Sequence, residues 1–271
     1  MSKRFDLRLT FNGIKGLVGV PGQIPWEIIV GYFIVALAVA FVLGKKTGGL
    51  GAFTTLDYVF IGIGAAFAVV WEFFIGAFLG GFIPRGISTY ISIGFWGGQL
   101  LTMMVVAALV RKVGVGMISF VVYSFLADLF HYGFGGEPIY FFYEALTYGL
   151  FLDLMIAVTG GNIFAVKSSL KASAQVAATS HDDQATTTVA HTGSSSSKLV
   201  ALMVIEGAII GLLFSFPDPL FYDGFFAPFL TGGYVNWQTI FFLLSAFIPG
   251  GVIVGGFAGV VANRIARALG Q

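Results

Sequence analysis

Seven long apolar stretches constrain this sequence more than any other feature. Each holds about 20 mostly hydrophobic residues, the length that an α-helix needs to cross the hydrocarbon core of a bilayer. A backbone inside lipid must form its hydrogen bonds within its own segment, so these spans are expected to be helices. We therefore predict an all-α, multi-pass protein of the cell membrane, with spans at Ile24–Leu43, Leu56–Leu79, Ile91–Val110, Val113–Phe130, Ile139–Val158, Leu199–Phe216 and Trp237–Ala262.

The composition supports this class and argues against several others. Hydrophobic residues make up 57% of the 271 positions and charged residues 10%, against roughly 45–50% and 25% in soluble domains. The formal net charge of +1 gives nucleic acid no basic surface to bind. Because the chain has no cysteine, disulfides, thiolate metal sites and thiol nucleophiles are excluded.

Catalytic and nucleotide-binding motifs are also missing from the sequence. We find no phosphate-binding Gly-x-x-x-x-Gly-Lys-Ser/Thr loop, no Ser-His-Asp order and no His-Glu-x-x-His helix. We therefore expect neither an enzyme nor a bound cofactor or metal, and any work driven by ATP would need a partner protein.

The basic residues predict which ends of the spans face the cytoplasm, because lysine and arginine concentrate in cytoplasmic loops. Over the last six spans nine basic residues fall on one side and only Arg85 on the other, which puts the C-terminus in the cytoplasm. The nine are Lys45, Lys46, Arg111, Lys112, Lys167, Lys171, Lys198, Arg264 and Arg267.

The N-terminal 50 residues disagree with this rule. If Ile24–Leu43 crosses the membrane, the tail with Lys3, Arg4, Arg8 and Lys15 lies outside. The alternative is a segment that lies along or re-enters the cytoplasmic face, where anionic lipid stabilises each charge by about 1 kcal/mol. We favour a crossing helix that precedes a six-helix domain at 51–271, and not a cleaved signal peptide, since no small-residue cleavage site follows.

Residues 160–198 change composition to Ser, Thr, Ala and Gln and predict a flexible cytoplasmic linker between five spans and two. The linker contains His181, Asp182, Asp183 and His191. These residue types can bind a metal, but a solvated low-complexity loop is the preferred interpretation.

Acidic residues inside the spans are the strongest functional signal. Glu72, Glu144 and Glu206 lie within spans and Asp128 lies near the end of one. A carboxylate that faced lipid would cost roughly 2.5–3.5 kcal/mol, so these side chains are expected to face the bundle interior. The predicted orientation puts Glu72, Asp128 and Glu144 in the outer half. Glu206 falls near mid-depth, where a coupling role and a packing role are equally open.

Aromatic and polar neighbours accompany these acids. Trp96 and Gln99 are three residues apart, and Glu144 and Tyr148 are four apart, so each pair is expected to share a helix face. We predict an outward-facing, acidic, aromatic-lined cavity for a cation, which an aromatic face stabilises by up to about 2 kcal/mol. The alternatives are structural hydrogen bonds for the acids and an aromatic belt for Trp96.

Two connections and one further acid complete this hypothesis. Residues 217–236 contain aromatic side chains and no basic residue, and are predicted to form a lid with the loop His131–Pro138. Asp153 lies on the inner side, where Arg111 or Lys112 is its expected partner.

Small residues four apart mark close helix contacts in lipid. Such pairs are Gly62 with Ala66 and Gly64 with Ala68, and the last span adds a denser glycine series. Internal packing and docking to another membrane subunit are both open. The series in the last span is Gly250, Gly251, Gly255, Gly256 and Gly259.

Short motifs from Asp57 to about Leu269 resemble those of the substrate-capture (S) components of energy-coupling-factor (ECF) vitamin transporters, most closely the YkoE type associated with thiamine and hydroxymethylpyrimidine. The turn Arg111-Lys112-Val113-Gly114 resembles the family's Arg-Lys-Pro-Gly turn, with Val113 in place of proline. Asp128 matches an acidic position at a span end, and the segment from Tyr148-Gly149 to Asp153 is similar to a Gln-Gly…Glu segment, with Tyr148 in place of an amide.

The resemblance implies a six-helix bundle that binds a vitamin in its outer half and works with a transmembrane scaffold subunit and two ATPases. It leaves the first helix as an accessory on the outside of the bundle. The expected ligand is a thiamine-like cation. Glu72 and Glu144 would neutralise it, Trp96 would stack on it, and Gln99 and Tyr148 would hydrogen-bond its pyrimidine, with Asp128 as a further contact.

Two other functions stay open at this point. A self-sufficient secondary transporter would use Glu206 and Glu72 as proton carriers, although no internal repeat of the kind common in such transporters is seen. A non-catalytic structural subunit of a membrane complex would have its cavity filled by side chains and would use its glycine faces for contact.

Overall fold

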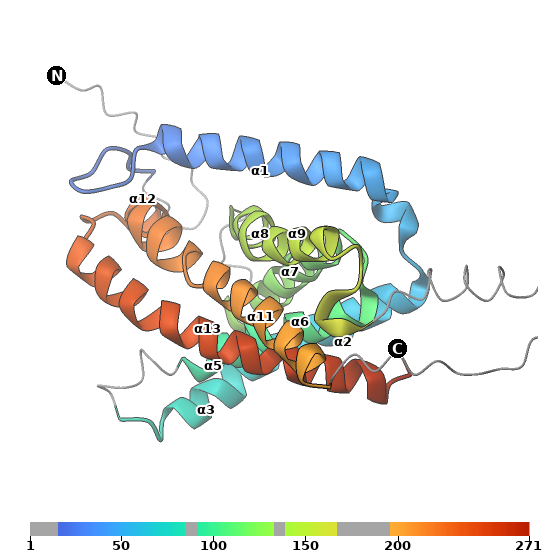
Figure 1. Ribbon diagram of the computed structural model, residues 1–271. Helices are drawn as coiled ribbons and strands as arrows, with labels where there is room; N and C mark the ends of the chain where they lie inside the picture. The colour runs from blue at the N-terminus through green and yellow to red at the C-terminus, as the bar shows by residue number, and fades with distance from the viewer. Residues whose placement is uncertain (1–15, 85–91, 133–138, 167–195, 271) are drawn as a thin grey trace, which may run out of the picture.

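The computed structural model describes residues 16–84, 92–132, 139–166 and 196–270, and in these ranges every regular element is a helix (Figure 1). This confirms the all-α prediction. Six described helices are long and apolar enough to cross a membrane, as expected of a multi-pass protein, and Val115–Phe130 is a shorter apolar helix. The six are Trp26–Thr47, Thr55–Gly80, Ile93–Val110, Ile139–Val158, Ser197–Thr231 and Trp237–Ala268.

Two of the long helices are uninterrupted, and the other apolar helices contain a π-helical segment. The uninterrupted ones are α1 (Trp26–Thr47) and α13 (Trp237–Ala268). The composite ones are α2 (Thr55–Val70), η2 (Trp71–Gly76) and α3 (Ala77–Gly80); α5 (Ile93–Phe95), η3 (Trp96–Thr102) and α6 (Met103–Val110); α7 (Val115–Ala127) and η4 (Asp128–Tyr132); α8 (Ile139–Glu144), η5 (Ala145–Gly149) and α9 (Leu150–Val158); and α11 (Ser196–Phe214), η7 (Asp218–Phe226) and α12 (Ala227–Thr231).

The basic residues of the described helices gather at one end of the bundle, here called the basic end. There α1 and α13 finish, α2 and α11 start, and α6 turns into α7 (Figure 1). Lys112 in that turn lies 2.5 Å from the Asp57 carboxylate at the start of α2. Asp57 also closes a capping box with Thr54, which satisfies backbone N–H groups at the beginning of α2. The opposite end, where α1 and α13 begin and α12 lies, is here called the cavity end, because the cavity described in the next subsection opens there.

Asp153 was expected to pair with Arg111 or Lys112, but Lys112 pairs with Asp57, and Asp153 is bonded to backbone groups. Its two carboxylate oxygens accept hydrogen bonds from the backbone N–H groups of Gly116 (2.9 Å) and Met117 (3.0 Å). These are unpaired donors in the first turn of α7, and a buried carboxylate from a neighbouring helix satisfies them as an N-cap would. Asp153 therefore fixes α9 against the start of α7.

The helices α11 and α13 pack backbone against backbone through their glycines. Gly207 and Gly211 of α11 face Gly251, Gly255 and Gly259 of α13. A Cβ atom at Gly255 would lie 2.9 Å from the Cα atom of Gly211, which is closer than two carbon atoms can pack. The glycine series of the last span therefore serves internal packing, whereas a Cβ atom at Gly62 would meet no neighbour.

Helix α1 runs along the bundle from the cavity end to the basic end (Figure 1). It is long and apolar enough to cross a membrane. Its attachment is narrow, because of its 22 residues only Ile29 and Ala36 are buried. The Tyr32 hydroxyl donates to the Leu146 carbonyl (3.0 Å), and the Tyr32 ring packs 4.6 Å from that of Phe221.

The segment before α1, residues 16–25, lies across the cavity end. Ile24 N–H donates to the Gly224 carbonyl (3.0 Å), and Leu17 N–H donates to the Phe229 carbonyl (3.3 Å). The Gln23 amide donates to the Phe225 carbonyl (3.2 Å). This segment therefore adds to the attachment of α1 through bonds to η7 and α12.

The connection at 217–236 is mostly helical, so the lid predicted there would consist of η7 and α12, and its role as a lid stays a prediction. Pro217 directly precedes η7, and a proline is tolerated at a helix start because the first N–H groups lack helical partners anyway. The described non-helical connection between α12 and α13 is limited to residues 232–236.

The predicted linker is also shorter than expected at both ends. Ile163 and Phe164 are fully buried, and α11 already begins at Ser196. Residues 167–195, with the two histidines and two aspartates noted above, lie outside the described residues. So do residues 133–138, the side chain of His131, and Arg85.

Candidate cation-binding cavity

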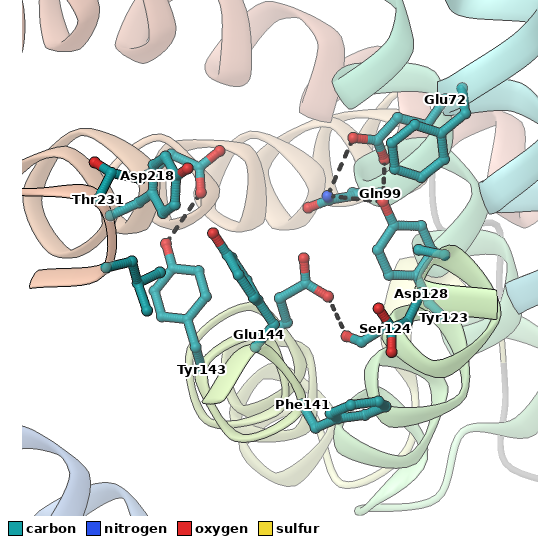
Figure 2. Close-up of a pocket in the computed structure, with 15 residues that line it drawn as sticks. Glu72, Gln99, Tyr123, Ser124, Asp128, Phe141, Tyr143, Glu144, Asp218 and Thr231 are labelled. Atoms are coloured by element: carbon teal, nitrogen blue, oxygen red, sulfur yellow. Dashed lines mark hydrogen bonds between the residues drawn. The ribbon is translucent and has the colours of Figure 1, made fainter. Parts of the chain in front are cut away.

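A cavity of about 460 Å³ opens at the cavity end, between η2, η3, α7, α8, η7 and α12 (Figure 2). This size is within the range of roughly 300–1,000 Å³ that is usual for small-molecule sites. Carbon atoms of Phe73, Ala127, Phe141 and Leu230 form part of its wall. The polar lining residues are Glu72, Gln99, Tyr123, Ser124, Asp128, Tyr140, Tyr143, Glu144, Asp218, Tyr222 and Thr231.

The charges of this cavity have one sign. Four lining residues are acidic, and none of the fifteen described residues that line it is basic. Figure 2 shows the carboxyl groups of Glu72, Glu144 and Asp218 arriving from three different helices around one space. Like charges gathered around one cavity repel each other more strongly in a medium less polar than water. A cation in the cavity would relieve that repulsion.

Glu72 is held by a hydrogen-bonded triangle. The Tyr123 hydroxyl donates to one Glu72 oxygen (2.5 Å), and the Gln99 amide donates to the other (3.4 Å). The same Gln99 nitrogen donates to the Tyr123 oxygen (3.1 Å). The Gln99 carbonyl oxygen is buried and has no hydrogen-bond partner in the described structure. A buried acceptor of this kind is costly unless a ligand donor or a water completes it.

The other two carboxylates are each oriented by hydroxyl groups. The Ser124 hydroxyl is hydrogen-bonded to Glu144. The Tyr143 and Tyr148 hydroxyls both donate to one oxygen of Asp218, at 3.0 and 2.6 Å. These hydroxyl groups fix the directions of the two carboxyl groups, whose other lone pairs stay available to a ligand.

π-Helical turns occur where the acids and the amide line the cavity. Glu72 is in η2 and Gln99 in η3, Asp128 and Asp218 begin η4 and η7, and Glu144 directly precedes η5. Such i→i+5 turns are rare in proteins overall, but those that occur are often found at functional sites. The wide turn changes the direction in which a side chain leaves the helix. Their coincidence at one end of the bundle supports a binding role for the cavity.

Aromatic rings complete the wall. Tyr140 and Tyr222 lie with ring centroids 6.0 Å apart and an interplanar angle of 40°, and both line the cavity. A cation near such ring faces gains electrostatic stabilisation in addition to that from the carboxylates.

The structure brings together four of the six predicted site residues. Glu72, Gln99, Asp128 and Glu144 line the cavity. Tyr148 does not line it and lies behind Asp218, to which it donates a hydrogen bond. Trp96 is also absent from the lining, since its indole is 3% exposed and packs edge-on against Phe247 at 5.5 Å. Trp96 therefore cannot stack on a ligand in this cavity, and Tyr140 and Tyr222 are the rings placed to do so.

Glu206, for which a packing role was one option, lies outside the cavity. Its carboxylate accepts a hydrogen bond from the Phe164 N–H (2.5 Å), and the Asn263 amide donates to the Phe164 carbonyl (2.7 Å). Phe164 has a left-handed backbone with φ of 53°. The two side chains thus hold the connection after α9, which is the packing alternative.

Sequence reasoning missed Asp218, Tyr123, Tyr143 and Ser124 as site residues. Asp218 stands among prolines and was interpreted as part of a loop. For Ser124 a signal existed, because it is four residues before Asp128 and such pairs share a helix face. Tyr123 and Tyr143 carry no comparable signal in the sequence.

The geometry suits an organic cation better than a chelated metal ion. The carboxyl groups of Glu72, Glu144 and Asp218 come from different helices and are each hydrogen-bonded to a hydroxyl group. The described residues include no group of three or more potential metal ligands close together. Comparisons of the chain with protein-family models, with curated proteins and with solved structures gave no match. The function is therefore inferred from the chemistry of the cavity.

Proposed function

We propose that this protein is a membrane-embedded substrate-binding subunit of an ATP-driven vitamin uptake transporter, and that its ligand is a small organic cation such as thiamine or a related pyrimidine. The observation that carries the proposal is a cavity of about 460 Å³ with four acidic and no basic residues among its described lining. An acidic cavity in a low-dielectric bundle would act as a cation receptor, since an ion pair is stronger there than in water.

Each part of the ligand has a counterpart in the wall. Glu72 and Glu144 would neutralise the positive charge, and Asp218 adds a third carboxylate on the other side. Tyr140 and Tyr222 would offer ring faces in the role first expected of Trp96. The unpartnered Gln99 oxygen is an acceptor for an amino group of the pyrimidine.

Partner proteins would supply energy in this proposal. The sequence has no phosphate-binding loop, and a receptor of this kind would act with a transmembrane scaffold and two ATPases. The cavity end would face outward and the basic end the cytoplasm, in line with the distribution of lysine and arginine.

A ligand panel tests the proposal directly. The purified protein in detergent would be heated with thiamine, hydroxymethylpyrimidine, riboflavin and biotin, and its melting temperature recorded. Ligand at 100 times its Kd stabilises the folded state by about 2.7 kcal/mol, so a true ligand raises the melting temperature measurably. We expect a response to thiamine or the pyrimidine and none to biotin, which carries a carboxylate.

Two results would contradict the proposed function and favour another one. No response to any cationic ligand would favour a structural subunit. Uptake of the ligand by liposomes that contain this chain alone would favour a self-sufficient transporter.

A further inference from the structure

A second, apolar groove of about 680 Å³ lies between α1 and the bundle. Its α1 side is made of side chains from Trp26 to Leu37, and its opposite side includes Phe142 of α8, Phe226 of η7 and Phe229 of α12. Figure 1 shows α1 passing over α8 and α12 with the rest of the bundle below. The groove exists because α1 buries only two of its own residues against its neighbours.

The surface of the groove is almost entirely hydrocarbon. Tyr143 contributes its ring, while its hydroxyl is directed to Asp218 on the side of the acidic cavity (3.0 Å). An apolar cavity of this kind excludes water and takes up apolar matter. In a membrane the abundant apolar matter is the acyl chain.

The length of the groove matches one leaflet of a bilayer. Its α1 side covers Trp26 to Leu37, eleven steps of 1.5 Å, or about 17 Å. Half of the hydrocarbon core is about 15 Å thick. The groove begins at Trp26, a residue type that marks the membrane–water boundary, and it runs from the cavity end toward mid-depth.

The volume also favours a lipid chain over another helix. A helical turn about 10 Å wide and 5.4 Å long fills roughly 420 Å³, so the groove has room for only about one and a half turns. An apolar cavity of about 150 Å³ binds one benzene, which has six carbon atoms. At the same ratio the groove holds roughly 25 carbon atoms, as many as one to two acyl chains contain.

The groove is continuous with the lipid-facing surface of the protein. Val30, Ile34 and Leu37 line it, and their side chains are 43%, 62% and 53% exposed. A chain from the surrounding bilayer can therefore enter from the side without any movement of the helices.

We propose that this groove is a binding site for an acyl chain of a phospholipid from the leaflet at the cavity end, and that the bound chain fastens α1 to the bundle. The lipid fills the space that α1 leaves open and contacts Phe142 and Phe229 on one side and Val30 and Ile34 on the other. Because Tyr143 lines both the groove and the acidic cavity, the chain also supports one wall of that cavity.

The test counts retained lipid in the intact protein. Protein purified in mild detergent is analysed by native mass spectrometry, with the double variant Val30→Trp/Ile34→Trp to fill the groove. The matched control is Val35→Trp, which places the same ring on an α1 residue that is 61% exposed and does not line the groove.

We expect one phospholipid to stay bound to the wild type and to the control, and the double variant to lose it. Equal lipid retention in all three proteins, or a tightly associated second copy in place of lipid, would overturn the assignment. A second measurement covers poor folding of the variant. Delipidated wild type should melt at a lower temperature and recover with long-chain phosphatidylglycerol but not with glycerol phosphate, and recovery with neither refutes the site.

Discussion

Replacing Glu144 by glutamine removes one negative charge from the cavity and keeps nearly the same shape. The amide oxygen of glutamine can still accept the hydrogen bond from Ser124, so the local packing should persist. The remaining carboxylates of Glu72 and Asp218 stay in place, and the change isolates the electrostatic contribution of one acid to ligand binding.

The expected loss follows from Coulomb's law. Two unit charges about 4 Å apart at an effective dielectric constant near 20 attract each other by about 4 kcal/mol. Part of this is offset by the desolvation that binding imposes on the carboxylate, and the other acids keep part of the attraction. We therefore expect a net loss of about 1.4–3 kcal/mol, or a rise in Kd of roughly 10- to 150-fold for thiamine.

Isothermal titration of thiamine into the purified variants measures this directly. The matched control is Glu206→Gln, the same substitution in a described helix at a position that contacts the Phe164 backbone and not the cavity. We expect its Kd to stay within about twofold of the wild-type value. Wild-type affinity in the Glu144 variant, or equal weakening in both variants, would refute the assignment of Glu144 to the ligand.

Three further predictions concern the fold and its orientation. Gly255→Val forces a side chain into the α11 backbone and should destabilise the bundle by about 1–3 kcal/mol or more, which a lower melting temperature would show. The control Gly62→Ala adds a methyl group that points into open space and should leave the melting temperature nearly unchanged. Equal effects of the two variants would contradict the packing described. Asp153→Asn replaces one carboxylate oxygen by a donor, leaves a buried N–H of α7 unpaired and should lower stability by about 1–3 kcal/mol in the same melting assay, and an unchanged melting point would speak against this cap. Since the chain has no cysteine, Pro21→Cys should react with an impermeant maleimide on intact cells and Lys46→Cys only after permeabilisation; labelling of both from one side would exclude a crossing α1.

The helices were predictable because apolar length alone identifies them. All seven stretches read from the sequence are helical, and their predicted ends differ from the observed ones mostly by a few residues. The exception is the stretch Leu199–Phe216, because α11 ends at Phe214 and helical structure resumes after a short break in η7 and α12. Pro217, Pro219 and Gly224 were interpreted as loop residues, yet prolines in a first helical turn cost no hydrogen bond.

The site was only partly predictable because it depends on the π-helical turns. Trp96 and Gln99 were expected on one face from α-helical spacing. In η3 the turn is wider, so each residue advances by less than 100° around the axis, and residues three apart diverge. Gln99 consequently lines the cavity while Trp96 packs against Phe247. No local sequence rule indicates where such turns form, because tertiary packing decides it.

Hydrogen bonds attach residues 16–25 to η7 and α12, the helical segments that cover one side of the cavity. Tyr222, Leu230 and Thr231, which line the cavity, belong to these tethered elements. Each of these hydrogen bonds contributes about 1 kcal/mol net. If η7 and α12 moved outward to admit or release a ligand, residues 16–25 would have to move with them or these bonds would have to break. Gln23→Ala, which removes one of these bonds, would thus leave the binding residues in place and alter the rate at which a ligand reaches them.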